Sequence, residues 1–491
     1  MAEVPVFLSP QEASDISQAH SKPKPATFRR FGEKCAVFGI SAHPEAAGLS
    51  ALGLFALQHR GQQSTGIVSS DGEKIFSHKR LGMVEQVFDQ RVFDLSTLRG
   101  HRTNAHNRYG TSYRQEEEDH SQPAMREGSE VSFSHNGNIP DTARLEEFLD
   151  SFGELNPNYN DSEMMQAAIA HYVDQGATLE DAVRDSIPLF TGAFSAIAMD
   201  KTSVVAFRDQ NGIHPLSIGL LNGAYVFSSE TCGLDIIGAR YLRDVNPGEM
   251  VIADDSGLRS EAFAKGEQKI DIFEYIYFAR PDSVLLGRTV AEVRRNLGII
   301  LAQEHPADAD VVVHVPDSAE SAAQGYSRET GIPHVQGLVK NRYVQRTFIT
   351  PGSGQRADAV ARKLNAVREF LHNKRVVVID DSIVRATTIR AIVRKLRDAG
   401  AREVHTRITS PPIKYPDFYG IDTPLQRELV ASSRSIEEIR RFIAADSLGY
   451  ISLAGAIKAV GLPKDMLYTG QFSGEYPIDI GQKREGIVFE S

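Results

Sequence analysis

The chain has 491 residues, of which 41% are apolar and 24% charged, and its formal net charge is −10. This length exceeds what one hydrophobic core supports, and the mixed composition is typical of a globular enzyme rather than a disordered or fibrous chain. The negative charge argues against non-specific nucleic-acid binding, which needs clustered Lys and Arg. Because we find neither a run of about 20 apolar residues nor a secretion signal, we expect a cytoplasmic protein with no membrane contact.

The first part of the chain predicts an extension followed by an α+β domain. Residues 1–34 are polar, Pro-containing and aperiodic, which indicates a mobile, propeptide-like extension. Over 35–265, short apolar or alternating runs such as AFSAIAMD and GEMVIAD are separated by Gly, Asn and Asp turns. Helical periodicity is confined to a few segments, such as SEMMQAAIAHYV. The pattern predicts mostly antiparallel sheets. The acidic run at 115–119 predicts a solvated loop.

A second pattern begins near residue 266 and continues to about residue 465. Buried-type strands such as ADVVVHVPDS, KRVVVIDDS and AREVHTRITS alternate with helical segments there. This alternation predicts an α/β domain with a parallel sheet. Residues 466–491 are left as a C-terminal segment.

The stretch VVVIDDSIVRATT, at 376–388, joins a buried strand to two carboxylates, Asp380 and Asp381, and then to a helix. In open α/β sheets, ligands bind at the carboxyl ends of strands, and a helix N-terminus offers free N–H groups to phosphate. Since carboxylates repel phosphate, we assign them to ribose hydroxyls, to Mg²⁺, or to both. An ordinary loop with acidic residues near a helix start is the alternative. Further donors around the anion are expected from Ser382, Arg385, Thr387 and Thr388.

This loop resembles the PRPP-binding loop of type I phosphoribosyltransferases. The segments FEYIYFARPDS, VPDSAESAAQGY and RITSPPIKYPDFYGIDTP resemble, in order and spacing, those of the amidophosphoribosyltransferase family, and the likeness spans roughly residues 33–480. It implies that Ser318 joins Asp380 and Asp381 around Mg²⁺ and PRPP.

The resemblance also implies a lid over PRPP at 340–356, KNRYVQRTFITPGSGQR. Its Gly-rich centre and flanking basic residues suit a segment that closes on pyrophosphate and excludes water. A solvated basic loop would have a similar composition. The basic residues concerned are Lys340, Arg342, Arg346 and Arg356.

The segment EKCAVFGI resembles the start of the N-terminal-nucleophile (Ntn) glutamine amidotransferases, in which a propeptide is removed and the new terminal Cys attacks glutamine. The expected first domain is therefore an Ntn-type sandwich, with Cys35 as nucleophile. A terminal α-amine, with a pKa of about 8, can accept the thiol proton, so one residue supplies nucleophile and base. The alternative is a buried strand cysteine. Cys232, the other cysteine, is interpreted as structural.

Other segments of this domain match the same family. ALQHRGQQSTG, at 56–66, resembles its helix and following turn. By resemblance, Arg108 in AHNRYGTSY holds the glutamine α-carboxylate, and Asp161 in NDSEMM holds its α-ammonium. In SHNGNI, the Asn136 side chain and the Gly137 N–H are expected to bind the oxyanion. Surface charges, and a hairpin turn at Asn-Gly, are the alternatives.

The sequence departs from the family pattern at three positions, where it has Ala36, Gly110 and Ala386. Ala386 is the most serious departure, because it adds a methyl group to a loop that must approach phosphate, and any positive φ there would be strained.

Many relatives hold an iron–sulfur cluster on four cysteines. The matching positions here are Asp271, Asp417, Tyr468 and Gln471, so no such cluster is expected.

The resemblance implies glutamine and PRPP as substrates, ammonia transfer to ribose C1, and 5-phosphoribosylamine, glutamate and pyrophosphate as products. It also implies the first committed step of de novo purine synthesis and a homo-oligomer, either a dimer or a tetramer. Two other functions stay open: a divergent amidotransferase with another acceptor, and a non-enzymatic PRPP-binding regulator.

Overall fold

The computed structural model describes residues 35–109, 120–341, 364–421, 425–481 and 487–488. The extension at 1–34, the acidic run at 115–119 and Gly110 lie outside the described residues, as does the predicted lid from Arg342 onwards, with Arg346 and Arg356.

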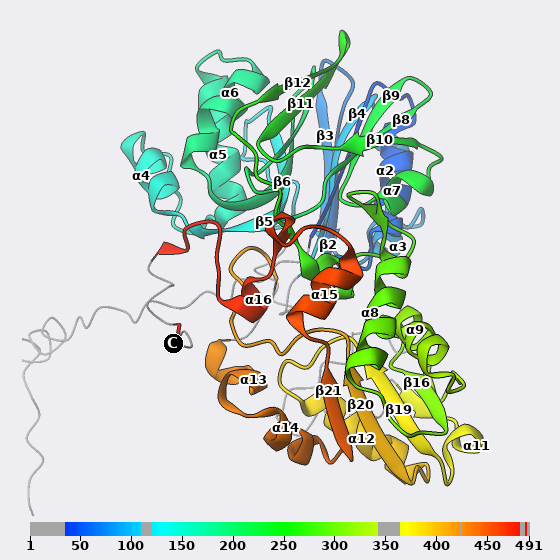
Figure 1. Ribbon diagram of the computed structural model, residues 1–491. Helices are drawn as coiled ribbons and strands as arrows, with labels where there is room; N and C mark the ends of the chain where they lie inside the picture. Colours follow the sequence, from blue (N-terminus) through cyan, green and yellow to red (C-terminus); the bar gives the residue numbers. More distant parts are fainter. Residues whose placement is uncertain (1–34, 110–119, 342–363, 422–424, 482–486, 489–491) are drawn as a thin grey trace, which may run out of the picture. The chain divides into compact units, whose positions relative to one another are not determined.

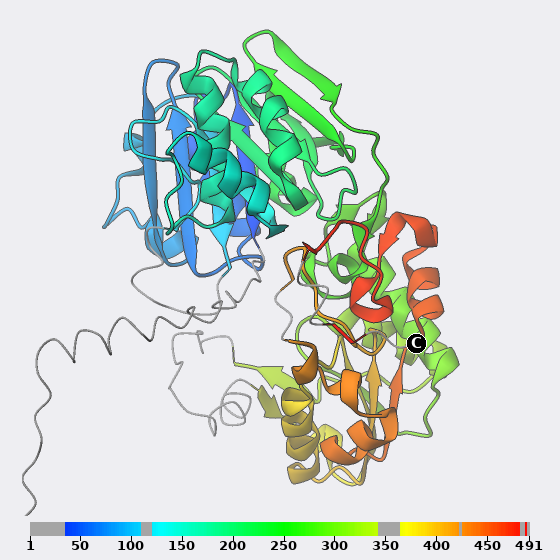
Figure 2. The same ribbon diagram turned by 90° about the vertical axis from the view of Figure 1, so that its left-hand side faces the viewer.

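Two antiparallel sheets stack face to face in the first part of the chain, with helices on both outer faces (Figures 1 and 2). The seven-stranded sheet has the order β10-β8-β9-β1-β4-β2-β3, and the five-stranded sheet has the order β12-β11-β7-β6-β5. The strands of the first sheet are β1 (Ala36–Ser41), β2 (Ser64–Ser70), β3 (Ile75–Leu81), β4 (Arg102–Arg108), β8 (Ser217–Leu221), β9 (Ala224–Ser228) and β10 (Arg240–Asp244). Those of the second are β5 (Ser132–Asp141), β6 (Thr191–Met199), β7 (Val204–Arg208), β11 (Glu249–Asp254) and β12 (Gly257–Ala262).

Apolar side chains fill the space between the two sheets. Val37 from one sheet and Ile197 and Val251 from the other belong to one buried cluster. Separate clusters join each sheet to its own helical layer, which accounts for strands buried on both faces. The helices are α2 (Ala46–Ala56), α3 (Val84–Val87) and α7 (Thr231–Asp235) beside the first sheet, and α4 (Ala143–Ser151), α5 (Asp161–Asp174) and α6 (Leu179–Ser186) beside the second.

A four-stranded parallel sheet with the order β16-β19-β20-β21 forms the second part of the chain. Because side chains alternate along a strand, Val377 and Ile379 join the core on one face, and Val376 and Val378 join the core on the other. The strands are β16 (Val311–His314), β19 (Arg375–Asp380), β20 (Glu403–Ile408) and β21 (Ser447–Tyr450). The helices are α8 (Val290–Glu304), α9 (Glu320–Thr330) and α15 (Leu453–Val460) on the first face, and α12 (Thr387–Asp398) and α14 (Ile436–Ile443) on the second.

Short elements complete the chain. β13 pairs in parallel with β22, and two antiparallel pairs are formed by β14 with β15 and by β17 with β18. Their bounds are β13 (Ile270–Asp271), β14 (Val284–Leu285), β15 (Arg288–Thr289), β17 (Leu338–Lys340), β18 (Leu364–Ala366) and β22 (Leu467–Tyr468). The short helices are η1 (Leu95–Thr97), η3 (Ile187–Leu189), η4 (Glu274–Phe278), α11 (Arg368–Leu371), η5 (Gln426–Glu428), α13 (Val430–Ser433), η6 (Lys464–Met466) and α16 (Gly470–Ser473).

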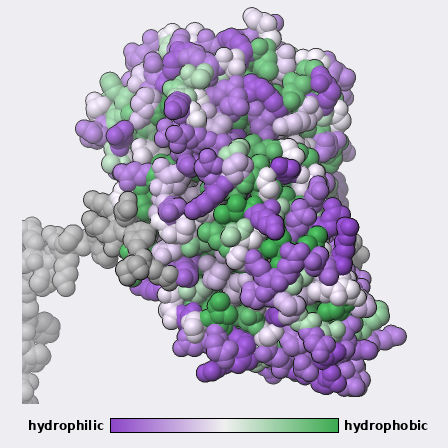
Figure 3. Space-filling view, in the orientation of Figure 1, coloured by the Kyte–Doolittle hydropathy of each residue, from purple (hydrophilic) through white to green (hydrophobic). Residues whose placement is uncertain are grey.

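The predicted fold class is confirmed: antiparallel sheets come first and a parallel sheet follows. One alternative is wrong, because Asn136 and Gly137 lie inside β5 and do not form a hairpin turn. The face in Figure 3 is largely hydrophilic, with small hydrophobic patches, as is usual for a globular protein. In the described part of the chain, we find no helix of the length and apolarity needed to cross a membrane.

Candidate active sites

Cys35 is fully buried and directly precedes β1. In the β1–β4 ladder, Ala36 is paired with Asn107, so continuing the antiparallel register by one residue puts Cys35 opposite Arg108. The backbone carbonyl of Cys35 accepts a hydrogen bond of 3.1 Å from Arg60 Nε. The predicted nucleophile is therefore next to the predicted carboxylate-binding residue.

Asn136 and Gly137 lie on β5, which contacts β1 across the sandwich. Asn136 is 1% exposed, and its Nδ2 makes no hydrogen bond to any described residue. Such a buried, unpaired donor is costly unless a ligand satisfies it. Gly137 has φ +155°, and a Cβ there would lie 2.0 Å from the carbonyl oxygen of Ala193, so only Gly fits. The site thus offers a buried amide donor, and glycine is required beside it because the strand packs closely on β6.

Asp161 is the first residue of α5, and local capping explains its position. Asn160 and Glu163 cap the helix reciprocally, which fixes where the helix begins. Asp161 Oδ2 accepts from Ile139 N on β5 at 3.3 Å, and His135 Nε2 is 3.6 Å from the same oxygen. Burial acts to raise the pKa of Asp161, but His135 and the backbone N–H groups outweigh it and lower that pKa. The residue is therefore held as an anion, as an ammonium-binding role requires.

A buried ionic group beside Cys35 was not predicted from the sequence. Arg60 Nη1 donates to Glu230 at 2.5 Å, while Nη2 and Nη1 donate to the two oxygens of Glu274 at 2.6 and 2.9 Å. Glu230 also accepts from His59 at 2.7 Å. Arg60 lies within ALQHRGQQSTG, so the only signal for it was that segment's likeness to the family.

The second candidate site lies at the carboxyl end of β19, as predicted. Asp380 ends the strand, and Asp381 follows it, with both residues buried. Ser318 Oγ donates to Asp381 Oδ2 at 2.5 Å, and Ser382 Oγ donates to Oδ1 at 2.6 Å. Burial and the neighbouring Asp381 raise the pKa of Asp380 well above its usual value. The three predicted metal residues are therefore brought together.

The rest of the predicted phosphate loop lies at the start of α12. Thr387 and Thr388 form its first turn and are exposed. Arg385 instead donates to Glu428 Oε2, at 2.8 Å from Nη2 and 3.1 Å from Nε. Lys340 lies on β17, where it donates to Asp317 at 2.6 Å. Both basic residues must exchange these carboxylates for phosphate oxygens if they bind PRPP.

Ala386 has φ +60° directly before α12, so the strain expected at this position is present. The methyl group itself is 3% exposed and belongs to the core cluster on the α12 face of the sheet, so it does not project from the loop.

Mg²⁺ fits the group at the end of β19. The described residues contain no cluster of three or more His, Cys, Asp or Glu that would enclose a metal. A Mg²⁺ ion commonly uses one or two carboxylates together with substrate phosphates and water, rather than a complete protein cage. Two adjacent, buried carboxylates match that limited donor set.

The four residues expected from the resemblance at the cluster positions, Asp271, Asp417, Tyr468 and Gln471, lie together in space. Gln471 Nε2 donates to Asp271 Oδ2 and to Asp417 Oδ2, both at 3.0 Å. Tyr468 OH donates to Asp417 Oδ2 at 2.9 Å. All four side chains are buried. We call this set the buried quartet; it is a hydrogen-bonded polar group that links β13, β22 and α16.

Cys232 fits its structural interpretation. It lies buried in α7, and burial together with Glu230 raises the pKa of its thiol. A thiol that resists ionisation is a poor nucleophile.

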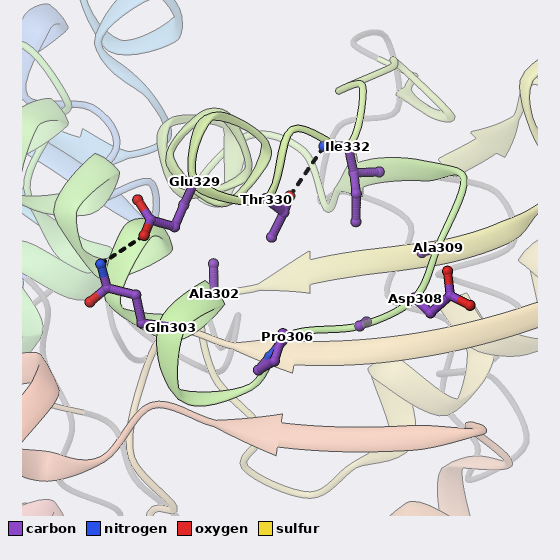
Figure 4. Close-up of a pocket in the computed structure, with 9 residues that line it drawn as sticks. Ala302, Gln303, Pro306, Asp308, Ala309, Glu329, Thr330 and Ile332 are labelled. Atoms are coloured by element: carbon purple, nitrogen blue, oxygen red, sulfur yellow. Dashed lines mark hydrogen bonds between the residues drawn. The ribbon is translucent and has the colours of Figure 1, made fainter.

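A pocket of about 520 Å³ lies away from the end of β19 that carries the carboxylates (Figure 4). It is formed where α8 and α9 end and the chain approaches β16, and Gln303 donates across its wall to Glu329 at 2.9 Å. Because ligands of parallel sheets bind at the carboxyl ends of strands, we do not assign this pocket to the reaction.

Comparison with known proteins gives a consistent result. Residues 106–235 match the family model for a glutamine amidotransferase domain. The amidophosphoribosyltransferase of Bacillus subtilis (strain 168) is 45% identical over 467 residues, which covers 93% of this chain and 97% of that protein. The amidophosphoribosyltransferase of Synechococcus elongatus is 45% identical over 470 residues, or 94% of each chain.

Solved structures agree with the sequence relatives. The glutamine PRPP amidotransferase from B. subtilis, complexed with ADP and GMP, matches with a TM-score of 0.84 and 44% identity, covering 91% of this chain and 98% of that one. A structure described as the allosteric regulatory enzyme of purine biosynthesis matches with a TM-score of 0.86 and 44% identity, covering 92% and 97%. The chain therefore belongs to the amidophosphoribosyltransferase family.

Proposed function

We propose that this protein hydrolyses glutamine at Cys35 and transfers the ammonia to PRPP, giving 5-phosphoribosylamine, glutamate and pyrophosphate. This is the first committed step of de novo purine synthesis. The observation that carries the proposal is the Asn136 amide, which is buried and without a partner among the described residues, on the strand across the sandwich from Cys35. The relationship to amidophosphoribosyltransferases over more than 90% of the chain supports the same reaction.

Glutamine hydrolysis follows from the first site. Cleavage before Cys35 frees its α-amine, which takes the thiol proton; the thiolate then attacks the amide carbon of glutamine. Asn136 Nδ2 and the Gly137 N–H stabilise the oxyanion. Ammonia leaves with that proton, and water hydrolyses the glutamyl thioester to glutamate. Arg108 and Asp161 hold the substrate's α-carboxylate and α-ammonium.

Ammonia transfer belongs to the second site. Ammonia attacks ribose C1 of PRPP and displaces pyrophosphate. Thr387, Thr388 and the N-terminus of α12 bind the 5-phosphate, and Arg385, Lys340 and Arg346 bind phosphate oxygens when PRPP is present. Asp380, Asp381 and Ser318 would hold Mg²⁺, which when bound neutralises charge on the pyrophosphate leaving group.

We assign the two half-reactions to residues 35–265 and 266–465, with 466–491 as a C-terminal segment and 1–34 as the propeptide. We also propose that the protein is a homo-oligomer, either a dimer or a tetramer, which light scattering would test.

The test is to mix purified protein with glutamine, PRPP and Mg²⁺ and to assay glutamate and pyrophosphate together. We expect equal amounts of both products. Glutamate without pyrophosphate would indicate another acceptor, and neither product would indicate a PRPP-binding regulator.

A further inference from the structure

Residues 417–421, which we call the Asp417 loop, follow β20 and are folded by one carboxylate. Asp417 Oδ1 accepts hydrogen bonds from the backbone N–H of Tyr419 at 2.8 Å and of Ile421 at 2.9 Å. Asp417 is 7% exposed. One buried side chain thus fixes the loop's backbone, and the backbone carbonyls of Phe418 and Tyr419 are left to bond elsewhere.

Through those two carbonyls, the Asp417 loop bonds to His214 and to β5, the strand that carries Asn136 and Gly137. Asn138 Nδ2 donates to Phe418 O at 2.7 Å. His214 Nε2 lies 2.6 Å from Tyr419 O and must carry the donated proton, because a carbonyl oxygen can only accept. These bonds join residues far apart in the sequence, from the antiparallel part of the chain to the part with the parallel sheet.

Gly420 meets Gly137 directly. Its φ is +125°, and a Cβ added there would lie 3.2 Å from Gly137 Cα and 3.0 Å from His214 Nε2. On its other side, Gly137 packs against Ala193 O, where a Cβ would approach to 2.0 Å. Gly137 is thus held between β6 and the Asp417 loop: a methyl group at Gly137 would clash with β6, and one at Gly420 would force its neighbours to shift by a few tenths of an ångström.

The buried quartet also holds the Asp417 loop in place. Asp417 Oδ2, the oxygen that does not fold the loop, accepts from Tyr468 OH and Gln471 Nε2. Tyr419 OH also binds the chain after α16, since it accepts from Ile478 N at 3.0 Å. The loop is therefore bonded both to the buried quartet and to β5. Through the loop, the position of the quartet determines the position of β5.

We propose that Asp417 and Gly420 are positioning residues for glutamine hydrolysis: the Asp417 loop sets the position of Asn136 and Gly137. The inference rests on the proposed oxyanion role of those two residues. Oxyanion donors act through geometry fixed before reaction, and a displacement of about 1 Å can lower a rate about 10²-fold. The buried quartet thus serves to place β5 through Asp417.

Gly420→Ala is the first test, with Gly257→Ala as its matched control. Gly257 has a similar φ of +116° but no atom within 4 Å of an added Cβ, so the control carries the same kind of backbone strain without the contact. We expect Gly420→Ala to lower kcat for glutamine hydrolysis about 10- to 100-fold with little change in KM for glutamine. We expect ammonia-dependent pyrophosphate release to stay within about two-fold of wild type.

Asn138→Ala gives a second, milder probe, because it removes only the hydrogen bond to Phe418 O and leaves the loop's own bonds intact. We expect kcat for glutamine hydrolysis to fall in this variant too, but by a smaller factor than in Gly420→Ala. Equal glutamine kcat in Gly420→Ala and Gly257→Ala, or loss of ammonia-dependent synthesis together with glutamine hydrolysis, would overturn the positioning role. Cys35→Ala, assayed beside them, tests the proposed function separately: undiminished glutamate release in that variant would refute the nucleophile itself.

Discussion

Arg60 and Glu274 form a bidentate ion pair, with Nη2 and Nη1 of the guanidinium 2.6 and 2.9 Å from the two carboxylate oxygens. The third nitrogen, Nε, holds the backbone carbonyl of Cys35. Burial acts to lower the pKa of Arg60, but Glu274 and Glu230 outweigh it and raise that pKa. One buried cation therefore links the backbone of Cys35, the proposed nucleophile, to Glu274, which follows the antiparallel sheets in the chain.

Arg60→Ala should consequently be strongly destabilising, since it leaves Glu230 and Glu274 buried without their cation. We expect the free energy of unfolding to fall by about 3–5 kcal/mol, as measured by urea denaturation. Arg91→Ala, which removes an exposed pair with Asp89, is the control and should leave stability unchanged. A small change in Arg60→Ala would show that the buried ionic group contributes little.

The left-handed alanines give a paired prediction. Ala386 and Ala444 both have φ +60°, but Ala386 is buried in the core, whereas Ala444 is exposed. Gly relieves the strain at either position, at a cost in unfolded-state entropy. Ala444→Gly should therefore stabilise by about 0.5–1 kcal/mol. Ala386→Gly also loses a buried methyl worth about 0.8 kcal/mol, so its net change should be near zero.

Thermal denaturation of both variants checks this difference. We also expect KM for PRPP to change less than about two-fold in Ala386→Gly, because the methyl group packs in the core. If Ala386→Gly gained as much stability as Ala444→Gly, the buried methyl group of Ala386 would contribute nothing to stability.

The buried quartet makes stability depend on pH. Burial and the charge of Asp417 raise the pKa of Asp271 well above its usual value, and burial raises that of Asp417. The folded protein thus binds protons more tightly than the unfolded chain does. This stabilisation is complete below the unfolded carboxyl pKa of about 4 and is lost as pH rises through the raised values.

Asp271→Asn removes one of these titrating groups while keeping its shape. As the pH rises above about 4 and through the raised pKa of Asp271, wild type should lose stability relative to Asp271→Asn. Asp150→Asn, at an exposed position on α4, is the control and should follow wild type at every pH. A difference between wild type and Asp271→Asn that is independent of pH would show that Asp271 does not titrate in this range.

Processing gives a separate prediction. Because the proposed base is the α-amine of Cys35, the intact mass of active protein should begin at that residue. Full-length chains with undiminished glutamine hydrolysis would contradict the terminal-amine mechanism.

Local patterns predicted much of this molecule. Alternation and helical spacing indicated both sheet types, and the strand-to-helix turn after β19 lies where the sequence placed it, before α12. These features depend on neighbours within a few residues. The amide at Asn136 was singled out by family likeness, but its lack of a hydrogen-bond partner among the described residues became visible only in three dimensions.

Contacts between distant segments could not be predicted in the same way. Arg60 and Glu274 are separated by 214 positions, and Asn138 and Phe418 by 280. No periodicity connects such residues, since their meeting depends on how sheets and loops pack. The buried quartet was identified only by resemblance, and its hydrogen bonds follow from the tertiary structure.

The separation of nitrogen release from nitrogen transfer is the central claim, and paired rates of pyrophosphate release with glutamine or with ammonia test it most directly. Cys35→Ala should lose glutamine-dependent release and keep ammonia-dependent release. In Asp381→Asn, pyrophosphate release should fall about 10²- to 10⁴-fold with either nitrogen source, because the variant removes a charge proposed to organise Mg²⁺ and PRPP. Loss of ammonia-dependent release in a normally folded Cys35→Ala protein would contradict the account.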